Sequence, residues 1–312
     1  MGRLRWNPFL GEWVIMTPKR ASRPFQDPNQ SCPFCPGSQE TLGKWNALTI
    51  DNKFPALSEE PGPFPLQDDI VIEGPAYGFC KVIITSPKHD EQIEDMSEKQ
   101  IHHVMKEYLR AFEELDSKDG IHYVAQFENR GRSIGVSLNH PHAQVYALPF
   151  IPPRIQREIE QAKKKWDAEK RCLVCEAVEN ETKAKDRIIR ETANFISCVP
   201  FFARLPYEVH IYPKRHVPSL IELQNHLVEL GLLIQDTVKR YANFFDETAY
   251  VMIMHTRPSK GELPYWHFHM ELYPPWRDKT RRKYLAGIEE GTGTYTNDSV
   301  PELTAKELRE AI

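Results

Sequence analysis

The sequence predicts an α+β protein made of two consecutive copies of one unit. Each half contains, in the same order, a Cys-x-x-Cys pair, a strand leading into a Pro-Lys corner with a histidine, a helix, and a strand with two histidines two residues apart. The interval from His89 to His140 equals the interval from His216 to His267. Chance does not easily produce these matches in one order, so we interpret the chain as a duplicated unit.

The elements of the two copies can be matched one by one. Strands are predicted over 82–85 and 208–212, where apolar and β-branched residues lead into the corner. A helix is predicted from Ser97, a favoured N-cap, and its apolar stripe has an equivalent between Leu227 and Tyr241. Strands over 123–127 and 250–254 follow, and each leads through a loop into the histidine strand. The stripes are core positions, so the helices support a site without forming it.

The domain boundaries follow from the stretch between the two copies. After Pro152 and Pro153 the chain is rich in charge up to Arg171, which predicts a solvated connecting helix. We expect an N-terminal unit over 1–152, the connection over 153–171 and a C-terminal unit over 172–312. The C-terminal unit ends in a basic tail, a glycine-containing turn region and a short helix after Pro301.

Composition excludes several functional classes. A formal net charge of −4 with 27% charged residues argues against a general nucleic-acid binder. No apolar stretch approaches the length needed to cross a membrane. The first residues lack the apolar core of a signal peptide. We therefore expect a cytoplasmic protein with neither a nucleic-acid nor a membrane partner.

The six cysteines form two close pairs and two single residues, Cys80 and Cys198. In a reducing compartment a close pair more often binds metal or performs redox chemistry than forms a structural disulfide. Cys32 and Cys35 lie in a turn-rich segment with no helix after it, which favours metal over a thioredoxin-type pair. Redox chemistry remains the alternative for this pair.

The segment His140-Pro141-His142-Ala143-Gln144 is the most informative part of the chain. Side chains alternate along an extended segment, so the two histidines and the glutamine face the same way. A neutral imidazole presented in this manner can attack phosphorus. The pattern indicates a histidine nucleophile for a nucleotide phosphate, with a buried structural histidine as the alternative.

These features together resemble the galactose-1-phosphate uridylyltransferase family of the histidine-triad superfamily, over nearly the whole length. The segments that carry the resemblance are Arg20-Ala21-Ser22-Arg23-Pro24-Phe25, Cys32-Pro33-Phe34-Cys35, Asn52–Leu57, Ser86-Pro87-Lys88-His89, Phe127–Gly131, the histidine run itself and Tyr273-Pro274-Pro275. The resemblance implies two tandem histidine-triad-like units. Each would be an antiparallel sheet with packed helices, and the two would form one continuous half-barrel-like sheet.

The resemblance also implies a ping-pong exchange. UDP-glucose would give its uridylyl group to His142 and release glucose-1-phosphate. Galactose-1-phosphate would then accept the group from His142. Gln144 would hydrogen-bond phosphate oxygens where hydrolase relatives carry a third histidine.

The resemblance implies further substrate-binding residues as well. Those expected to bind substrate are Arg20, Arg23, Asn52, Asn129, Gly135, Ser137, Gln144, Lys283 and Tyr284. Lys283 and Tyr284 resemble residues that contribute across a dimer, so we expect a homodimer. The second copy is expected to be catalytically silent, because the Asn-x-Gly and Gly-x-Ser patterns have no clear counterpart before His267.

Three metal groups follow from the resemblance and the repeat. Cys32, Cys35, His89 and His140 match the structural zinc ligands of the family, and such a set suits a closed tetrahedral site. The repeat predicts a second zinc site with the ligands Cys172, Cys175, His216 and His267. A reduced, metal-free pair is the alternative there. Glu158, His255, His269 and Glu271 match an iron or zinc site of bacterial members, with Glu271 in place of a histidine.

Other functions compete with uridylyl transfer. A relative that uses ADP-glucose, as adenylyltransferase or phosphorylase, is the nearest, and the second Cys-x-x-Cys pair slightly favours it. A hydrolase or a non-catalytic nucleotide sensor is a second class, and Gln144 argues against the hydrolase. A zinc-finger nucleic-acid module is the third, and the net charge and the absence of a basic helix argue against it.

Overall fold

The computed structural model describes residues 2–18, 31–62, 68 and 70–312. The strands are β1 (Arg3–Asn7), β2 (Glu12–Met16), β3 (Leu48–Asp51), β4 (Glu73–Pro75), β5 (Phe79–Ile84), β6 (Tyr123–Arg130), β7 (His142–Leu148), β8 (Ile188–Glu191), β9 (Phe195–Cys198), β10 (Val209–Pro213), β11 (Tyr250–His255) and β12 (His269–Tyr273). The α-helices are α1 (Glu98–Asp116), α2 (Pro153–Glu169), α3 (Leu173–Ala184), α4 (Leu227–Phe244), α5 (Gly287–Thr292) and α6 (Pro301–Glu310). Short 3₁₀ turns are η2 (Ile93–Asp95), η3 (Arg132–Ile134) and η4 (Ile221–His226).

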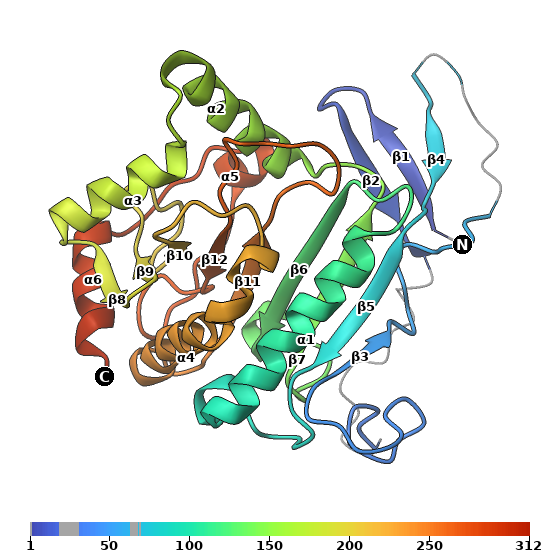
Figure 1. Cartoon of the computed structure of the whole chain (residues 1–312), viewed down its shortest axis with the longest axis horizontal. Coiled ribbons are helices and arrows are strands. Elements are labelled where there is room, and N and C mark those ends of the chain that lie inside the picture. Colours follow the sequence, from blue (N-terminus) through green and yellow to red (C-terminus); the bar gives the residue numbers. More distant parts are fainter. Residues whose placement is uncertain (1, 19–30, 63–67, 69) are drawn as a thin grey trace.

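One open, antiparallel sheet runs through both halves of the chain (Figure 1). Its nine strands have the order β3-β5-β7-β6-β11-β12-β10-β9-β8. The two copies join where β6 pairs with β11, from Tyr250 opposite Arg130 to Met254 opposite Gln126. The expected α+β fold with one continuous sheet is confirmed. A separate small sheet, with the order β2-β1-β4, lies near the N-terminus (Figure 1).

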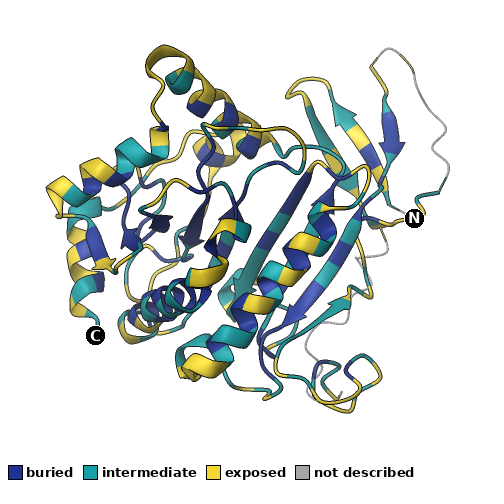
Figure 2. Ribbon diagram, viewed as in Figure 1, coloured by how far each residue is buried: buried dark blue, intermediate teal, exposed yellow. Residues whose placement is uncertain are grey.

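Helices α1 and α4, the matching helices of the two copies, lie side by side against one face of the sheet (Figure 1). The Ser97 hydroxyl accepts a hydrogen bond from the Gln100 N–H, so it forms the expected N-cap of α1. The apolar stripes of both helices are buried in one core shared by the two copies (Figure 2). The helices meet closely at Gly231, where a Cβ would lie 2.4 Å from Ile101.

The opposite face of the sheet carries the functional residues because of strand alternation. On β7, Ala143 and Val145 belong to the core under the helices. His142 and Gln144 therefore face the other way. The same alternation on β12 places Met270 in the helical core and directs His269 and Glu271 to the other face. In each copy, the polar side chains of the histidine strand thus lie on the sheet face away from α1 and α4.

Two helices were not predicted from the sequence. Helix α3 begins immediately after Cys172, whose sulfur accepts the backbone N–H of Cys175 at 3.4 Å and serves as N-cap. Helix α5 lies in the tail, where the sequence indicated turns; Glu289 supports it by accepting the Ala286 N–H at 3.1 Å. Among the described residues, no helix combines the length and apolar character that crossing a bilayer requires.

Candidate active site and metal-binding groups

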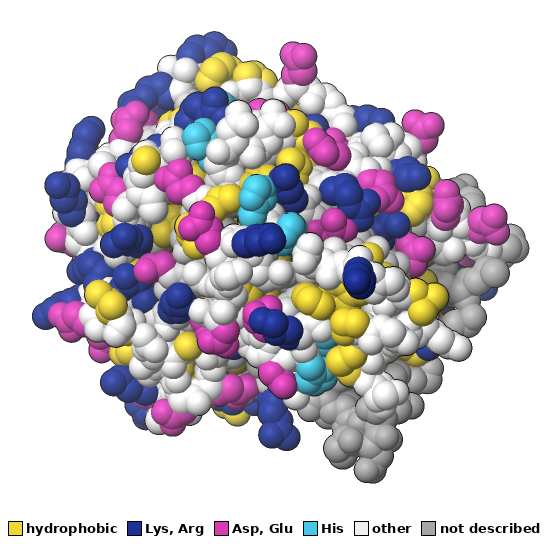
Figure 3. Space-filling view, turned by 60° about the horizontal axis from the view of Figure 1, so that its bottom comes forward, with side chains coloured by type: hydrophobic (Ala, Val, Ile, Leu, Met, Phe, Trp, Pro, Cys, Tyr) yellow, Lys and Arg dark blue, Asp and Glu magenta, His cyan; other side chains and the backbone are white. Residues whose placement is uncertain are grey.

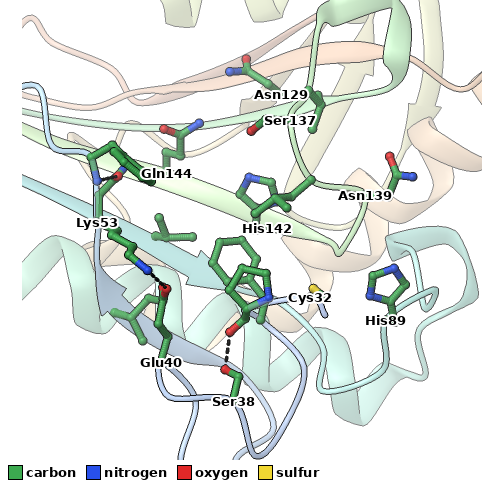
Figure 4. Close-up of a pocket in the computed structure, with 18 of the residues that line it drawn as sticks. Cys32, Ser38, Glu40, Lys53, His89, Asn129, Ser137, Asn139, His142 and Gln144 are labelled. Carbon is green, nitrogen blue, oxygen red and sulfur yellow. Dashed lines mark hydrogen bonds and ion pairs between the residues drawn. The ribbon is translucent and has the colours of Figure 1, made fainter. Parts of the chain in front are cut away.

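A pocket of about 1000 Å³ opens on the sheet face opposite α1 and α4 (Figure 4). The predicted catalytic and substrate-binding residues that line it are Asn52, Asn129, Gly135, Ser137, His142 and Gln144, and the predicted metal ligands Cys32 and His89 line it as well. The first six come from the segment after β3, from β6, from the loop before β7 and from β7 itself. Arg20 and Arg23 lie outside the described residues. The fold thus brings six of the predicted catalytic and substrate-binding residues together around one cavity.

His142 is the first residue of β7 and is half-buried. Its Nδ1 lies 2.8 Å from the carbonyl oxygen of His140, and only a protonated Nδ1 can donate there. The neutral ring therefore carries its lone pair on Nε2, the tautomer that a nucleophile needs. The ring of Phe34 packs edge-on against His142 with 5.2 Å between centroids, which restricts its rotation. This histidine is oriented by both a hydrogen bond and a ring contact.

Gln144 and Asn129 stand beside His142 on the same face of the sheet (Figure 4). The register of β6 and β7 pairs Phe127 with Gln144, which puts Asn129 level with His142. The Gln144 Oε1 atom is buried and has no hydrogen-bond partner among the described residues. A buried amide oxygen without a partner is costly unless a ligand satisfies it. The side chain is therefore placed to meet a polar group in the pocket.

The other predicted binding residues that line the pocket, Asn52, Gly135 and Ser137, lie in two loops. Asn52 Oδ1 accepts the Phe54 N–H at 2.9 Å, so part of this side chain shapes its own turn. Gly135 has a φ of 80°, a conformation that favours glycine, and a Cβ there would meet nothing within 4 Å. Ser137 follows in the same loop and points toward the space in front of His142 (Figure 4).

Sequence reasoning missed several side chains that line the pocket. Phe34 lies between the two cysteines of the first pair, so its place in that motif was a signal for its position beside the histidine run. Lys53 and Glu40 form an ion pair of 3.4 Å across the cavity wall (Figure 4). Arg132 also lines the pocket and forms no ion pair within the described part of the chain. Lys53 belongs to the Asn52–Leu57 segment of the resemblance, whereas no motif distinguished Glu40 or Arg132 from ordinary surface charges.

The first cysteine pair meets two histidines at one end of the pocket. The Sγ atom of Cys32 lies 3.6 Å from His140 Nδ1, and that of Cys35 lies 3.5 Å from His89 Nδ1 and 3.7 Å from His140 Nδ1. A tetrahedral zinc ion would hold sulfur and nitrogen ligands about 3.5 Å apart. His140 Nε2 lies 2.8 Å from the Ser86 carbonyl oxygen, which leaves Nδ1 directed at the sulfurs. Burial also lowers the pKa of His140 and favours its neutral, metal-binding form.

The second group repeats this geometry in the C-terminal copy. The Sγ–Nδ1 distances are 3.7 Å for Cys172 and His267, 3.5 Å for Cys175 and His216, and 3.4 Å for Cys175 and His267. His267 Nε2 lies 3.1 Å from the Pro213 carbonyl oxygen, the counterpart of the contact between His140 and Ser86. Both Cys/His groups therefore have the donor types and spacing of a metal site.

The fold also brings together the third predicted group, Glu158, His255, His269 and Glu271. It differs from the two Cys/His groups because it contains two carboxylates and no cysteine. His255 Nε2 and Glu271 Oε2 are buried, 3.4 Å apart and without hydrogen-bond partners among the described residues. Burial alone would raise the pKa of Glu271, but the nearby histidine rings hold it well below its ordinary value. Arg154 and Arg204 lie 3.5 and 3.8 Å from the same carboxylate. Two arginines thus lie beside the acidic side chains of this group.

Lys283 and Tyr284 do not line the pocket of their own chain. Lys283 Nζ lies 3.3 Å from Glu289 and 3.1 Å from Asp298, so its positive charge is paired with two carboxylates of the C-terminal tail. Tyr284 is 70% exposed, and its ring lies 5.7 Å from the Arg282 guanidinium.

Positive and negative side chains intermingle on the face shown in Figure 3, which fits the small net charge.

Comparison with known families gives two matches that together span almost the whole chain. Residues 2–152 match the model described as galactose-1-phosphate uridyl transferase, N-terminal domain. Residues 156–312 match the model for the C-terminal domain of the same family.

Individual relatives agree with these matches. The galactose-1-phosphate uridylyltransferase of Thermotoga maritima is 36% identical, over 99% of this chain and 98% of its own length. The ADP-glucose phosphorylase of Arabidopsis thaliana is 32% identical, over 98% of this chain and 92% of its own length. A solved structure of a uridylyltransferase superposes with a TM-score of 0.90 at 33% identity, covering 100% of this chain and 98% of that chain. The solved Arabidopsis ADP-glucose phosphorylase gives a TM-score of 0.76 at 30% identity, covering 99% of both chains.

Proposed function

This chain belongs to the galactose-1-phosphate uridyl transferase family, and from that premise we propose that it transfers a uridylyl group from UDP-glucose to galactose-1-phosphate. The observation that carries the proposal is the hydrogen bond from His142 Nδ1 to the carbonyl of His140, in a pocket that Gln144 also lines. Membership of the family alone would not identify the reacting atom.

In the first half-reaction, His142 Nε2 attacks the phosphorus that carries the uridine. The Nε2–P bond forms while the bond from phosphorus to the glucose-1-phosphate oxygen breaks, and glucose-1-phosphate leaves with that electron pair. The ring becomes positively charged as it bonds to phosphorus. The Nδ1–H hydrogen bond to the His140 carbonyl stabilises this charge, since a charged donor strengthens a hydrogen bond.

In the second half-reaction, a phosphate oxygen of galactose-1-phosphate attacks the same phosphorus from the side that glucose-1-phosphate left. The Nε2–P bond breaks, UDP-galactose forms and the imidazole returns to its neutral form. Gln144 can donate to a phosphate oxygen without adding negative charge or a group that takes up protons. Asn129 and Ser137 are proposed to bind the nucleotide phosphates, and Asn52 the uridine side of the pocket. Gly135 was expected to donate its N–H to a phosphate, but that N–H donates to the Arg132 carbonyl oxygen at 2.9 Å, so Gly135 lines the pocket without a free donor.

We propose zinc as the ion in both Cys/His groups, because two thiolates and two imidazoles at these distances suit a closed tetrahedral site. Such zinc has a structural role. In the first group His140 is both a ligand and the residue whose carbonyl orients His142, so the metal group supports the nucleophile.

We propose that the working form is a homodimer and that the tail of one subunit completes the pocket of the other. Tyr284 is exposed at the surface, and Lys283 holds the surrounding tail through its ion pairs. The test is complementation. Inactive His142→Ala protein mixed with a defective Tyr284→Ala protein should regain activity if subunits exchange, because one mixed pocket then has both residues. A monomer in sedimentation, or no recovery after proven exchange, contradicts this assembly.

The similarity to an ADP-glucose phosphorylase makes ADP-glucose a second candidate substrate for this pocket. One experiment separates the two. The protein is incubated with UDP-glucose or ADP-glucose labelled in the nucleotide, denatured at neutral pH and examined by mass spectrometry. A UMP adduct on His142 and formation of UDP-galactose support the proposal. An AMP adduct supports the alternative, and steady release of free UMP without transfer identifies a hydrolase instead.

A further inference from the structure

The loop from Gly131 to Gly135, which contributes Arg132, Ile134 and Gly135 to the pocket wall, is held by a side chain of the second copy. Ser133 donates its backbone N–H to Glu247 Oε1 at 3.0 Å and its hydroxyl to Glu247 Oε2 at 2.6 Å. Glu247 lies 114 residues away, between α4 and β11. Both oxygens of one carboxylate thus bind one residue of this loop.

The loop also approaches the second copy closely at its first residue. Gly131 has a φ of 91°, and a Cβ there would lie 2.4 Å from the Ala249 Cβ and 3.0 Å from Glu247 Oε1. The Arg282 guanidinium donates to the carbonyl oxygen of Ser133. The N–H, hydroxyl and carbonyl of Ser133 are therefore all bound by the C-terminal half, whereas a Cβ added to Gly135 at the other end would meet nothing within 4 Å.

The charge of Glu247 strengthens this attachment. Burial alone would raise the pKa of its carboxyl group, but the hydrogen bonds from Ser133 outweigh burial and lower it. The group is therefore a carboxylate at neutral pH, and hydrogen bonds to an ionised acceptor are stronger than neutral ones.

We propose that Glu247 is a positioning residue for the transfer reaction. It fixes the loop, in which the Gly135 N–H donates to the Arg132 carbonyl oxygen at 2.9 Å, so that the Ser137 hydroxyl stands where the substrate phosphates are bound in front of His142. This inference rests on the proposed function. Its physical basis is that catalysis depends on donors held within about 0.5 Å of their productive positions, and misplacement by about 1 Å can cost about a hundredfold in rate.

The chain offers a matched control in Glu229. Its Oε1 accepts the Asn194 backbone N–H at 2.8 Å and its Oε2 accepts the Asn194 side-chain amide at 2.6 Å. The two carboxylates thus make the same pattern of two bonds to one residue. Neither Glu229 nor Asn194 lines the pocket, so Glu229 variants report the structural cost alone.

The experiment compares Glu247→Ala and Glu247→Gln with Glu229→Ala and Glu229→Gln in the full-length protein. Melting temperature, KM, kcat and the single-turnover rate of nucleotidyl-enzyme formation are measured for each. We expect all four to melt somewhat lower. Only the Glu247 variants should lower kcat/KM for the nucleotide sugar, about tenfold to a hundredfold for alanine. Glutamine keeps one acceptor oxygen and should retain part of the rate.

The outcomes distinguish this inference from the function on which it rests. If the unaltered protein forms no nucleotidyl adduct, the proposed function fails. If the unaltered protein forms the adduct and Glu247→Gln forms it at the same rate while melting lower, the positioning role is wrong. Ser133→Ala provides a second check, because its effect on the rate should overlap with that of Glu247→Ala rather than multiply it.

Discussion

His142 donates the hydrogen of its Nδ1 to the carbonyl oxygen of His140 at 2.8 Å, while the ring of His140 faces two cysteine sulfurs. The proposed nucleophile therefore lies only two residues from a member of the first Cys/His group and is hydrogen-bonded to it. The second copy repeats the contact, with His269 Nδ1 lying 3.1 Å from the carbonyl of His267. The duplication has preserved this geometry even where the surrounding residues have changed.

Replacing His142 with alanine should abolish transfer. The imidazole forms the covalent bond to phosphorus, so we expect the rate to fall by about 10⁴-fold or more. Adduct formation by mass spectrometry and exchange of labelled sugar phosphate measure the effect. His122→Ala changes an exposed histidine that does not line the pocket and should leave both readings unaltered. Substantial turnover by His142→Ala would place the nucleophile elsewhere.

Replacing His140 with asparagine should remove the metal of the first Cys/His group and lower the stability of the protein. Its effect on the rate of transfer should be smaller. We expect zinc to fall from two equivalents to one and the melting temperature to drop. A bound metal stabilises the native state by about 4 kcal/mol when its free concentration is a thousand times its Kd. His267→Asn should remove the other equivalent. Unchanged metal content in His140→Asn would contradict the proposed role.

The metal content of the intact protein tests the third group. We expect two zinc ions per chain by elemental analysis, one for each Cys/His group. A third ion that disappears in Glu271→Gln, with the other two retained, would assign a metal to Glu158, His255, His269 and Glu271. Cys172→Ser combined with Cys175→Ser should leave a single zinc ion.

Stability should fall in acid partly through Glu229. Burial alone would raise the pKa of this carboxyl group, but the hydrogen bonds from Asn194 outweigh burial and lower it. The stabilisation is therefore present above the unfolded-state pKa, about 4.3, and is lost as the pH falls toward the folded-state value. Denaturant titrations should show Glu229→Gln to be less stable than the parent at pH 7, with the difference shrinking as the pH falls through the folded-state pKa. A difference that stays constant over that range would argue against ionisation as the cause.

Gly231→Ala should destabilise the contact between α1 and α4. Alanine improves helix propensity by about 1 kcal/mol, but overpacking a tight contact costs about 1–3 kcal/mol. The added Cβ would lie 2.4 Å from Ile101 and 2.8 Å from Met105, so we expect the packing cost to exceed the gain. Chemical denaturation measures the balance, and Gly287→Ala, where a Cβ meets nothing within 4 Å, is the control.

Local sequence patterns were enough to predict the duplication and the matched strands and helices. These features follow from periodicity, capping and the spacing of chemically distinctive residues, all of which are written in short stretches of chain. The strand between Tyr123 and Phe127 and the N-cap at Ser97 are examples. The residues of the first Cys/His group came from the family resemblance, and those of the second from the repeat.

How the second copy supports the first could be seen only once the chain was folded. The contact of Glu247 with Ser133 depends on the register between β6 and β11, and no local pattern marks a surface glutamate as the partner of a distant loop. The same holds for the Phe34 ring against His142 and for the arginines beside Glu271. Such contacts join residues far apart in the chain, so their geometry is fixed by the packing of the whole sheet.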